Sequence, residues 1–373
     1  MRLLARTFAA ASLAAIAFGG AEAKDLRLAS GAPPVHPAAD PLYAKFAEFL
    51  PQETNGALTG TLLGPEVVNI AQVKQALQSS LAEVGNLLPL FVPADLPNTA
   101  LAGDLAFLAT NPHAMGAAMT EYVVTCGECQ AEFKKLGGVF VGAGSSDVYV
   151  ILTTKPVRSA ADLKGLRLRS GGAPYARWAD AMGAAPAQVP VSDQFEQISQ
   201  GALDGTMASI SDLVSYRLID VAKYVIDLPL GTYHTTSNFT VGTAAWQGLT
   251  PDERAGFARA ANKASALFTQ NWGYDRPENV RKKAVEAGLE IIPATQEMID
   301  ATNAFREADI DAAVKVATEQ LGVTDAKAKI ERFRGLVAKW TAIVGEAGGD
   351  VEKITARVQE EIWNKVDYST YGL

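Results

Sequence analysis

Arg169 is the residue of this chain best placed to hold a small anion. It ends the segment Leu166-Arg-Leu-Arg169, whose alternation of apolar and charged residues is typical of a strand. The segment is followed by Ser170-Gly-Gly172, where the backbone can approach a ligand closely. Ligands of open α/β sheets bind at the carboxyl ends of strands, and a planar guanidinium matches a carboxylate bidentately. We therefore expect Arg169 to bind a small anion such as a carboxylate.

Other polar and aromatic residues near predicted strand ends are candidates for contact with the same ligand, and each has an ordinary alternative in a turn or in the core. These candidates are Asn86, Glu83, Tyr149, Phe195, Ser211 and Asn238. An amine-bearing ligand is an alternative, because Glu83, Asp147 and aromatic side chains could face a cation. We expect Arg167, which lies farther from the strand end, to be structural, and we expect the histidines to lie at the surface or in the core.

The first 23 residues have the pattern of a secretory signal peptide. A basic start at residues 1–6 precedes an apolar run at residues 8–18 and an A-x-A cleavage site at residues 21–23. The apolar run is too short to span a bilayer, and no later run approaches the length of a membrane helix. We therefore expect cleavage after Ala23 and export of the mature chain to the periplasm.

The chain has two cysteines, Cys126 and Cys129, in a C-x-x-C arrangement. In an oxidising compartment this spacing favours a disulfide that closes a small loop, with a redox pair or half a zinc site as alternatives. No second C-x-x-C or H-x-x-x-H completes a metal site, so we expect no metal. Serine-hydrolase, zinc-protease, phosphate-loop and dinucleotide motifs are also missing from the sequence, which indicates a protein that is not an enzyme and uses no cofactor.

Length and charge narrow the class further. With 373 residues, the chain is long enough for two domains. The net charge is −8 and no run of lysine and arginine occurs, which argues against a nucleic-acid partner. An acidic total still permits an anionic ligand, because a site needs only local positive charge.

Strands and helices alternate along the chain, which predicts mostly parallel sheets covered by helices. The predicted strands cover residues 26–30, 58–63, 82–86, 139–142, 148–152, 166–169, 187–191, 203–208, 224–228, 238–246 and 289–293. A helix is expected over residues 114–136, carrying both cysteines. Another begins at Thr250 with a capping box, and Pro277 should kink or end it. Residues from 296 onward should be mostly helical.

Several segments resemble, in order, the periplasmic solute-binding proteins of TRAP transporters, the DctP type. Asp162-Leu-Lys-Gly-Leu-Arg-Leu-Arg169 is similar to the family's D-L-K-G-L-K-I-R. Residues 182–186, 193–205, 221–225 and 246–253 are similar to its later segments, so that the resemblance covers nearly the whole mature chain. It implies an α/β fold of the two-lobed periplasmic binding protein type, in which each lobe is a mixed, mostly parallel sheet flanked by helices and a long helix spans both lobes.

On this resemblance, residues 24–150 and 235–260 form lobe I, and residues 151–234 and 261–330 form lobe II. Residues 331–373 form C-terminal helices that pack on the lobes. The resemblance also implies that the lobes close around one small organic acid, that Arg169 forms the carboxylate salt bridge, and that the loaded protein docks on membrane permease subunits. We expect a monomer.

The chain departs from the family at one informative point. Many relatives carry a second arginine about twenty residues before the first, whereas the segment that ends here at Tyr149 has no basic residue. A position that is aromatic in the family is Phe195, which cannot donate a hydrogen bond. These features favour a small monocarboxylate. The alternatives are an amine, alcohol or sulfonate on the same scaffold, a ligand-sensing partner of a membrane receptor, and a periplasmic enzyme.

Overall fold

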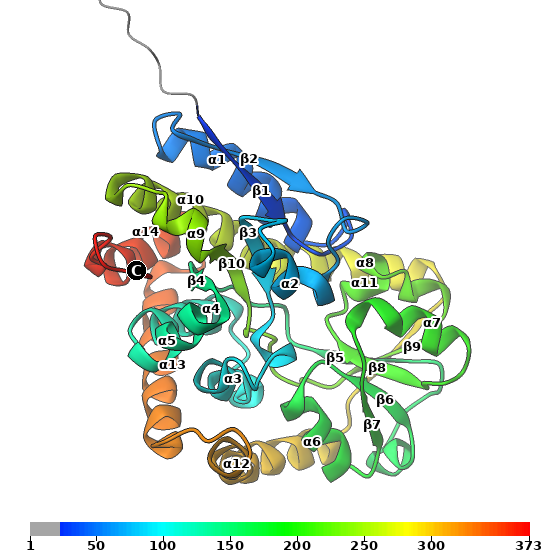
Figure 1. Cartoon of the computed structure of the whole chain (residues 1–373). Coiled ribbons are helices and arrows are strands. Elements are labelled where there is room, and N and C mark those ends of the chain that lie inside the picture. The colour runs from blue at the N-terminus through cyan, green and yellow to red at the C-terminus, as the bar shows by residue number, and fades with distance from the viewer. Residues whose placement is uncertain (1–22) are drawn as a thin grey trace, which may run out of the picture.

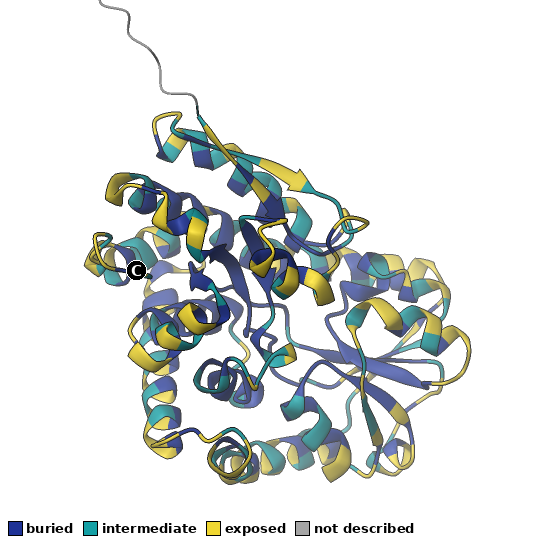
Figure 2. Cartoon of the chain, viewed as in Figure 1, coloured by how far each residue is buried: buried dark blue, intermediate teal, exposed yellow. Residues whose placement is uncertain are grey.

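Two mixed β-sheets, each covered by helices, form two lobes in the computed structural model of the chain, which describes residues 23–373 (Figure 1). The expected signal peptide lies, but for Ala23, outside the described residues. Within the described range, no helix combines the length and the apolar character needed to cross a membrane. The central strands of both sheets are buried, and the covering helices expose their outer faces (Figure 2).

The sheet of lobe I has the strand order β2-β1-β3-β10-β4. Its strands are β1 (Lys24–Ala29), β2 (Leu58–Leu63), β3 (Val84–Leu87), β4 (Gly138–Phe140) and β10 (Ser237–Gly242). β1 runs parallel to β2 and β3, and β10 returns antiparallel between β3 and β4. The helices packed around it are α1 (Ala44–Glu53), α2 (Val73–Gln78), α3 (Pro97–Gly103), α4 (Pro112–Val124), α5 (Gly127–Leu136) and α9 (Thr243–Gln247).

The sheet of lobe II has the order β11-β9-β5-β8-β6-β7. Its strands are β5 (Val150–Thr153), β6 (Arg167–Ser170), β7 (Ala185–Gln188), β8 (Gly205–Ala208), β9 (Tyr224–Asp227) and β11 (Glu290–Pro293). β6 is parallel to both β7 and β8, so the carboxyl ends of these strands meet at one edge of the sheet. The helices of this lobe are α6 (Ala173–Ala181), α7 (Gln194–Ser199), α8 (Asp212–Ser215) and α11 (Arg276–Glu286).

A long helical segment connects the lobes, as expected. It begins at α10 (Pro251–Gln270), where Thr250 Oγ1 accepts a hydrogen bond from Glu253 N–H and the Glu253 carboxylate accepts one from Thr250 N–H. It continues through a π-helical turn at Asn271–Asp275 into α11. Pro277 therefore does not end the helical segment. It lies in the first turn of α11, where a missing N–H needs no partner within the helix.

Two extended segments, residues 141–149 and 228–236, also cross between the lobes and lie side by side. Ser146 N–H donates to Tyr233 O (2.9 Å), and Tyr149 N–H donates to Gly231 O (2.8 Å). Leu230 N–H in turn donates to Tyr149 O (3.0 Å). We call this pair the crossing segments. Because they are short and mutually hydrogen-bonded, they are suited to act as a hinge between the lobes.

The remaining helices are α12 (Gln296–Glu319), α13 (Ala326–Ala347) and α14 (Val351–Glu361). α12 contacts α6 in lobe II and α3 in lobe I, α13 packs on α4, and α14 packs on α10. The strands divide between the sheets in a way compatible with the expected lobe boundaries. Those boundaries remain our interpretation.

Two expectations about local structure are wrong. The helix expected over residues 114–136 is two helices, because Cys126 has extended backbone and caps α5, with its Sγ accepting a hydrogen bond from Cys129 N–H (3.0 Å). Cys126 and Cys129 are joined by a disulfide, as the spacing suggested. The strand expected over residues 238–246 ends at Gly242, and Trp246 lies on α9, where its indole N–H donates to Tyr371 O.

Candidate ligand-binding site

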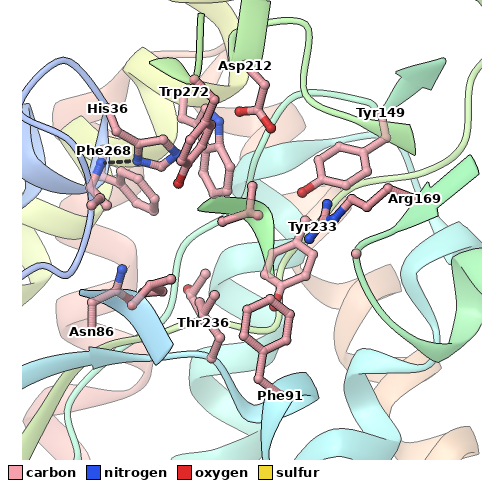
Figure 3. A pocket seen from close by; sticks show the side chains of 17 residues that line it. His36, Asn86, Phe91, Tyr149, Arg169, Asp212, Tyr233, Thr236, Phe268 and Trp272 are labelled. Atoms are coloured by element: carbon pink, nitrogen blue, oxygen red, sulfur yellow. Dashed lines mark hydrogen bonds between the residues drawn. The ribbon is translucent and has the colours of Figure 1, made fainter. Parts of the chain in front are cut away.

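A cavity lies between the lobes, beside the crossing segments (Figure 3). Its empty volume, which includes open solvent at its mouth, is about 550 Å³. Both lobes, the crossing segments and the long helical segment contribute to its walls. The lining residues are Ala32, His36, Ala38, Ile70, Asn86, Leu88, Phe91, Tyr149, Arg169, Gly171, Val191, Asp212, Tyr216, Tyr233, Thr236, Phe268 and Trp272.

Arg169 reaches this cavity from the carboxyl end of β6 and is 2% exposed. Its Nε–H donates to Val189 O (3.1 Å). Among the described residues, the two terminal guanidinium nitrogens have no hydrogen-bond acceptor and no carboxylate partner. A Cβ atom at Gly171 would lie 3.5 Å from Nη1 of Arg169, an ordinary van der Waals distance, so the backbone passes close beside the guanidinium. A buried cation with two free nitrogens is a strong site for an anion.

Asp212 lines the same cavity from the start of α8, just beyond the end of β8. Its Oδ2 accepts a hydrogen bond from Gln194 Nε2 (3.3 Å), and Gln194 is itself fixed by the hydroxyl of Thr206 (3.1 Å). Burial raises the pKa of Asp212 to about 6, against the opposing effects of Gln194 and of the positive charges of Arg169 and Arg276. A buried carboxylate and a buried guanidinium therefore face one space.

His36 enters the cavity from the loop after β1. Its Nδ1 accepts a hydrogen bond from Ala38 N–H (3.0 Å), which places the proton of the neutral ring on Nε2. Burial lowers the pKa of His36 to about 3, and the charge of Arg276 acts in the same direction. The ring packs against Tyr216 and Trp272, with centroid distances of 5.6 and 5.5 Å. His36 is thus a neutral hydrogen-bond donor toward the cavity.

Asn86 faces the cavity from β3 and is 4% exposed. Its Oδ1 is buried and has no hydrogen-bond partner within residues 23–373. Figure 3 places Asn86 and His36 on the side of the cavity opposite Tyr149 and Arg169. Unpaired buried polar groups are costly, which makes them candidates for hydrogen bonds to a solute.

Aromatic rings form much of the remaining wall. Tyr149 stacks on Tyr175 and Tyr233, with ring centroids 5.0 and 6.1 Å apart. Phe268 and Trp272 from the long helical segment are 5.1 Å apart. Such a wall excludes water and supports the apolar body of a small solute.

Three of the candidates chosen from the sequence, Arg169, Asn86 and Tyr149, meet in this cavity. Arg167 is structural as expected, because it forms an ion pair with Asp204 (2.9 Å). The charge pair and its hydrogen bonds hold the pKa of Asp204 well below its usual range.

The structure places the other four candidates outside the cavity lining. Glu83 accepts hydrogen bonds from the backbone and side chain of Arg27. The guanidinium of Arg217 lies over the ring of Phe195, with its Cζ 5.4 Å from the ring centroid. The expected contacts of Glu83 and Phe195 with the solute are therefore corrected to a surface ion pair and a cation–π contact.

Ser211 and Asn238 are buried, and neither lines the cavity. Ser211 lies in a turn in which its N–H donates to Ser209 Oγ (3.0 Å), and its neighbour Asp212 is the residue that lines the cavity. Asn238 lies on β10 and donates from Nδ2 to Ser265 Oγ (2.9 Å). Side-chain direction within a turn or strand, which the sequence did not reveal, decides both cases.

Sequence reasoning missed His36, Asp212, Phe268 and Trp272 as lining residues. Asp212 could have been found, since it follows β8 and β8 is a parallel neighbour of β6. His36 follows the end of β1, which is the same kind of signal. Phe268 and Trp272 had no such signal, because they belong to a helical segment that enters the site from a distant part of the sequence.

The arrangement is suited to reversible binding: it combines one buried cation, one buried acid, a neutral imidazole and an aromatic wall. Across residues 23–373, no three His, Cys, Asp or Glu side chains gather in the manner of a metal centre.

Two comparisons with known proteins agree with this geometry. The family model of bacterial extracellular solute-binding protein, family 7 (DctP) matches residues 28–316. Among solved structures, a TRAP periplasmic solute-binding protein from Bordetella bronchiseptica with bound (R)- and (S)-mandelate is 24% identical, with a TM-score of 0.73. The match covers 84% of this chain and 99% of that one.

Two further solved structures have the same fold. A TRAP solute-binding protein from Rhodoferax ferrireducens in complex with benzoate is 18% identical, covering 86% of this chain and 99% of that chain, with a TM-score of 0.77. An extracytoplasmic solute receptor from Bordetella pertussis that binds pyroglutamic acid is 20% identical, covering 84% and 100% of the two chains, with a TM-score of 0.71.

Proposed function

Because the chain belongs to family 7 of the bacterial extracellular solute-binding proteins, the DctP family of TRAP solute receptors, we propose that it captures a small monocarboxylate in the periplasm. The loaded protein then delivers this solute to membrane permease subunits. The receptor acts as a monomer, without a cofactor and without catalysing a reaction.

The observation that carries this proposal is the state of Arg169. Its guanidinium is buried at the cavity wall, and within the described residues its terminal nitrogens have no acceptor. A carboxylate would satisfy both nitrogens with two parallel charge-assisted hydrogen bonds. The three solved relatives named above hold small carboxylates, which supports the same ligand class here.

The charges of the cavity wall favour a solute with one carboxylate over a solute with two. Among the described residues that line the cavity, Arg169 alone carries a permanent positive charge, and His36 stays neutral. A second carboxylate would face Asp212 without a cation to balance it. Burying an unpaired charge costs far more than a hydrogen bond gains, so dicarboxylates should bind poorly.

Binding requires the lobes to part and close. Asn86 and His36 belong to lobe I, Arg169 and Asp212 belong to lobe II, and all four are buried in this conformation. The crossing segments between them provide the hinge. Closure joins the two half-sites around the solute and removes it from water.

A thermal-shift screen with matched solutes tests the proposal. Monocarboxylates, the corresponding primary amides and the corresponding alcohols would be compared with ligand-free protein, because a ligand that binds only the folded state raises its melting temperature. We expect stabilisation by a narrow set of monocarboxylates and none by their amides or alcohols. Equal stabilisation by an acid and its amide, or stabilisation only by non-acids, would contradict the proposal.

A further inference from the structure

Asp212 is a buried acid that the binding of a simple carboxylate does not explain. It is 4% exposed and lines the cavity that also holds Arg169. In the part of the chain that the structure describes, Asp212 forms no ion pair with Arg169 or with any other cation. A carboxylate bound to Arg169 would bring a second negative charge into the space that Asp212 already faces.

Three of the four other buried aspartates within residues 23–373, Asp104, Asp204 and Asp309, have cationic partners. Asp204 pairs with Arg167 and Lys155, and Asp309 pairs with Arg177 (2.6 Å). These acids hold elements of the fold together, as a structural role predicts. Asp212 and Asp147 lack such a partner among the described residues. Asp147 accepts a hydrogen bond from Ile210 N–H (3.2 Å) and does not line the cavity, so Asp212 is the unpaired acid that faces the solute space.

Asp212 is nevertheless held in a fixed direction. Gln194 Nε2 donates to its Oδ2, and the hydroxyl of Thr206 donates to Gln194 Oε1. Within residues 23–373, its other oxygen, Oδ1, accepts no hydrogen bond. Figure 3 shows the carboxylate directed toward the space between Trp272 and Tyr149. The residue therefore presents a free acceptor to the occupant of the cavity.

We infer that the solute carries a hydrogen-bond donor, either a hydroxyl or an N–H group, in addition to its carboxylate, and that this donor binds Asp212. The inference rests on the proposed function, because Arg169 is taken to hold the carboxylate. The ligand class is then a small hydroxy or amino acid whose apolar body packs on the aromatic wall. A carboxylate and an ammonium group on one solute would balance the charges of Arg169 and Asp212 together.

The positions of the charged groups also set the orientation of the solute, with its carboxylate and its donor group both facing lobe II. The lobe I wall offers His36 Nε2–H and the Oδ1 of Asn86, which can hydrogen-bond the solute but carry no charge. The charged poles of the site therefore both lie in lobe II. A solute can bind to lobe II through its two polar groups first, and the neutral groups of lobe I then close over it.

The experiment compares acids that differ only in the donor. One set is phenylacetate, mandelate and phenylglycine, and a second set is propionate, lactate and alanine. Dissociation constants would be measured by calorimetry for the wild-type protein, for Asp212→Ala and for Asp212→Asn. Asp220→Asn is the matched control, since Asp220 pairs with Arg217 on the exposed surface.

For the wild type, we expect a donor-bearing acid to bind at least about tenfold more tightly than its parent acid in one set. Asp212→Ala should reduce this preference to about threefold or less, while Asp220→Asn should preserve it. Asp212→Asn keeps an acceptor oxygen without the charge, so it should retain part of the preference for a hydroxyl and lose the preference for an ammonium group.

The inference is overturned if parent acids bind as tightly as donor-bearing acids in both sets, or if Asp212→Ala leaves the preference intact. The comparison within the wild type needs no variant, so a variant that fails to fold does not obscure the result. Failure of the proposed function has a different signature. In that case no acid of either set binds to the wild type, or acids bind no better than their amides.

Discussion

Arg169 and Asp212 face one cavity from neighbouring parallel strands, and yet within the described residues no ion pair joins them. Arg169 ends β6, and Asp212 follows β8, with Arg169 opposite Thr206 in the register of the two strands. Two buried opposite charges that stay apart leave room for a solute to interact with both. The pair therefore defines the polar end of the site, and the aromatic wall defines its apolar part.

Asp212 should reduce the stability of the ligand-free protein at neutral pH. Burial raises its pKa from the ordinary value of 3.8 to about 6. As the pH rises past 3.8, the carboxyl group ionises first in the unfolded chain, so the free energy of unfolding falls until the pH passes about 6. Asp212→Asn should then be more stable than the wild type by up to about 3 kcal/mol at pH 7 and nearly equal to it at pH 4.

Urea unfolding of ligand-free protein at several pH values between 4 and 8 measures this difference, with Asp220→Asn as the exposed control. Other groups lie close enough to Asp212 to affect how the free energy of unfolding depends on pH. They are Arg169, Arg276, Gln194, Asp147, Tyr149 and Tyr216. Of these, Asp147 also titrates near neutrality, because burial raises its pKa to about 8. A stability difference that does not change with pH would contradict the role given to Asp212.

His36 should remain neutral throughout the physiological range. Its Nδ1 already accepts a hydrogen bond from Ala38 N–H, and burial lowers its pKa to about 3. Nuclear magnetic resonance of the ring nitrogens should show one tautomer, protonated at Nε2, from about pH 5 to pH 8. A titration midpoint near 6.5, the ordinary value of a histidine, would show that the ring is solvated and outside the closed site.

Arg177 should stabilise the packing of α6 against α12 and the end of α3. It lies on α6 and forms ion pairs with Asp309 on α12 and with Asp104 beside α3 (2.6 and 3.5 Å). Burial raises the pKa of Asp104 to about 6 despite the neighbouring charge of Arg177, so removal of Arg177 leaves two buried acids without a cation. Arg177→Met should lower the free energy of unfolding by about 3–5 kcal/mol.

The matched control for this change is Arg217→Met. Arg217 forms an ion pair with Asp220 on the exposed surface, and its loss should cost less than about 1 kcal/mol. Urea unfolding at pH 7 compares the two variants directly. Equal losses would mean that the three-residue cluster contributes no more than a surface pair.

The sequence was sufficient to predict the elements that show strong local patterns. The strand that ends at Arg169, its following glycines and the capping box at Thr250 are set by residues next to one another in the chain. The helix break at Cys126 was missed because it depends on the side-chain cap that Cys126 provides. The end of β10 at Gly242 was missed because Trp246, on the helix that follows, is held by a contact with the distant Tyr371. The passage of the long helix beyond Pro277 likewise depends on a π-helical turn that local pattern does not reveal.

The site could be predicted in part for the same reason. Arg169, Asn86 and Tyr149 lie at or near strand ends, and strand ends meet at one edge of a sheet. We chose Ser211, but its neighbour Asp212 lines the cavity. A difference of one residue in a turn changes which side chain faces the site, and the sequence does not reveal it. The helical residue Trp272 enters the wall only through the packing of the two lobes.

The most direct test of this account is the binding of the best monocarboxylate to Arg169→Gln, measured by calorimetry beside the wild type and Arg167→Gln. Arg167 lies on the same strand but pairs with Asp204 outside the cavity, so its variant controls for the loss of one positive charge. We expect Arg169→Gln to weaken binding of the acid about 100-fold or more and Arg167→Gln to change it by less than about threefold. An Arg169→Gln protein that folds and binds the acid as tightly as the Arg167→Gln control would contradict the assignment of Arg169 as the carboxylate anchor.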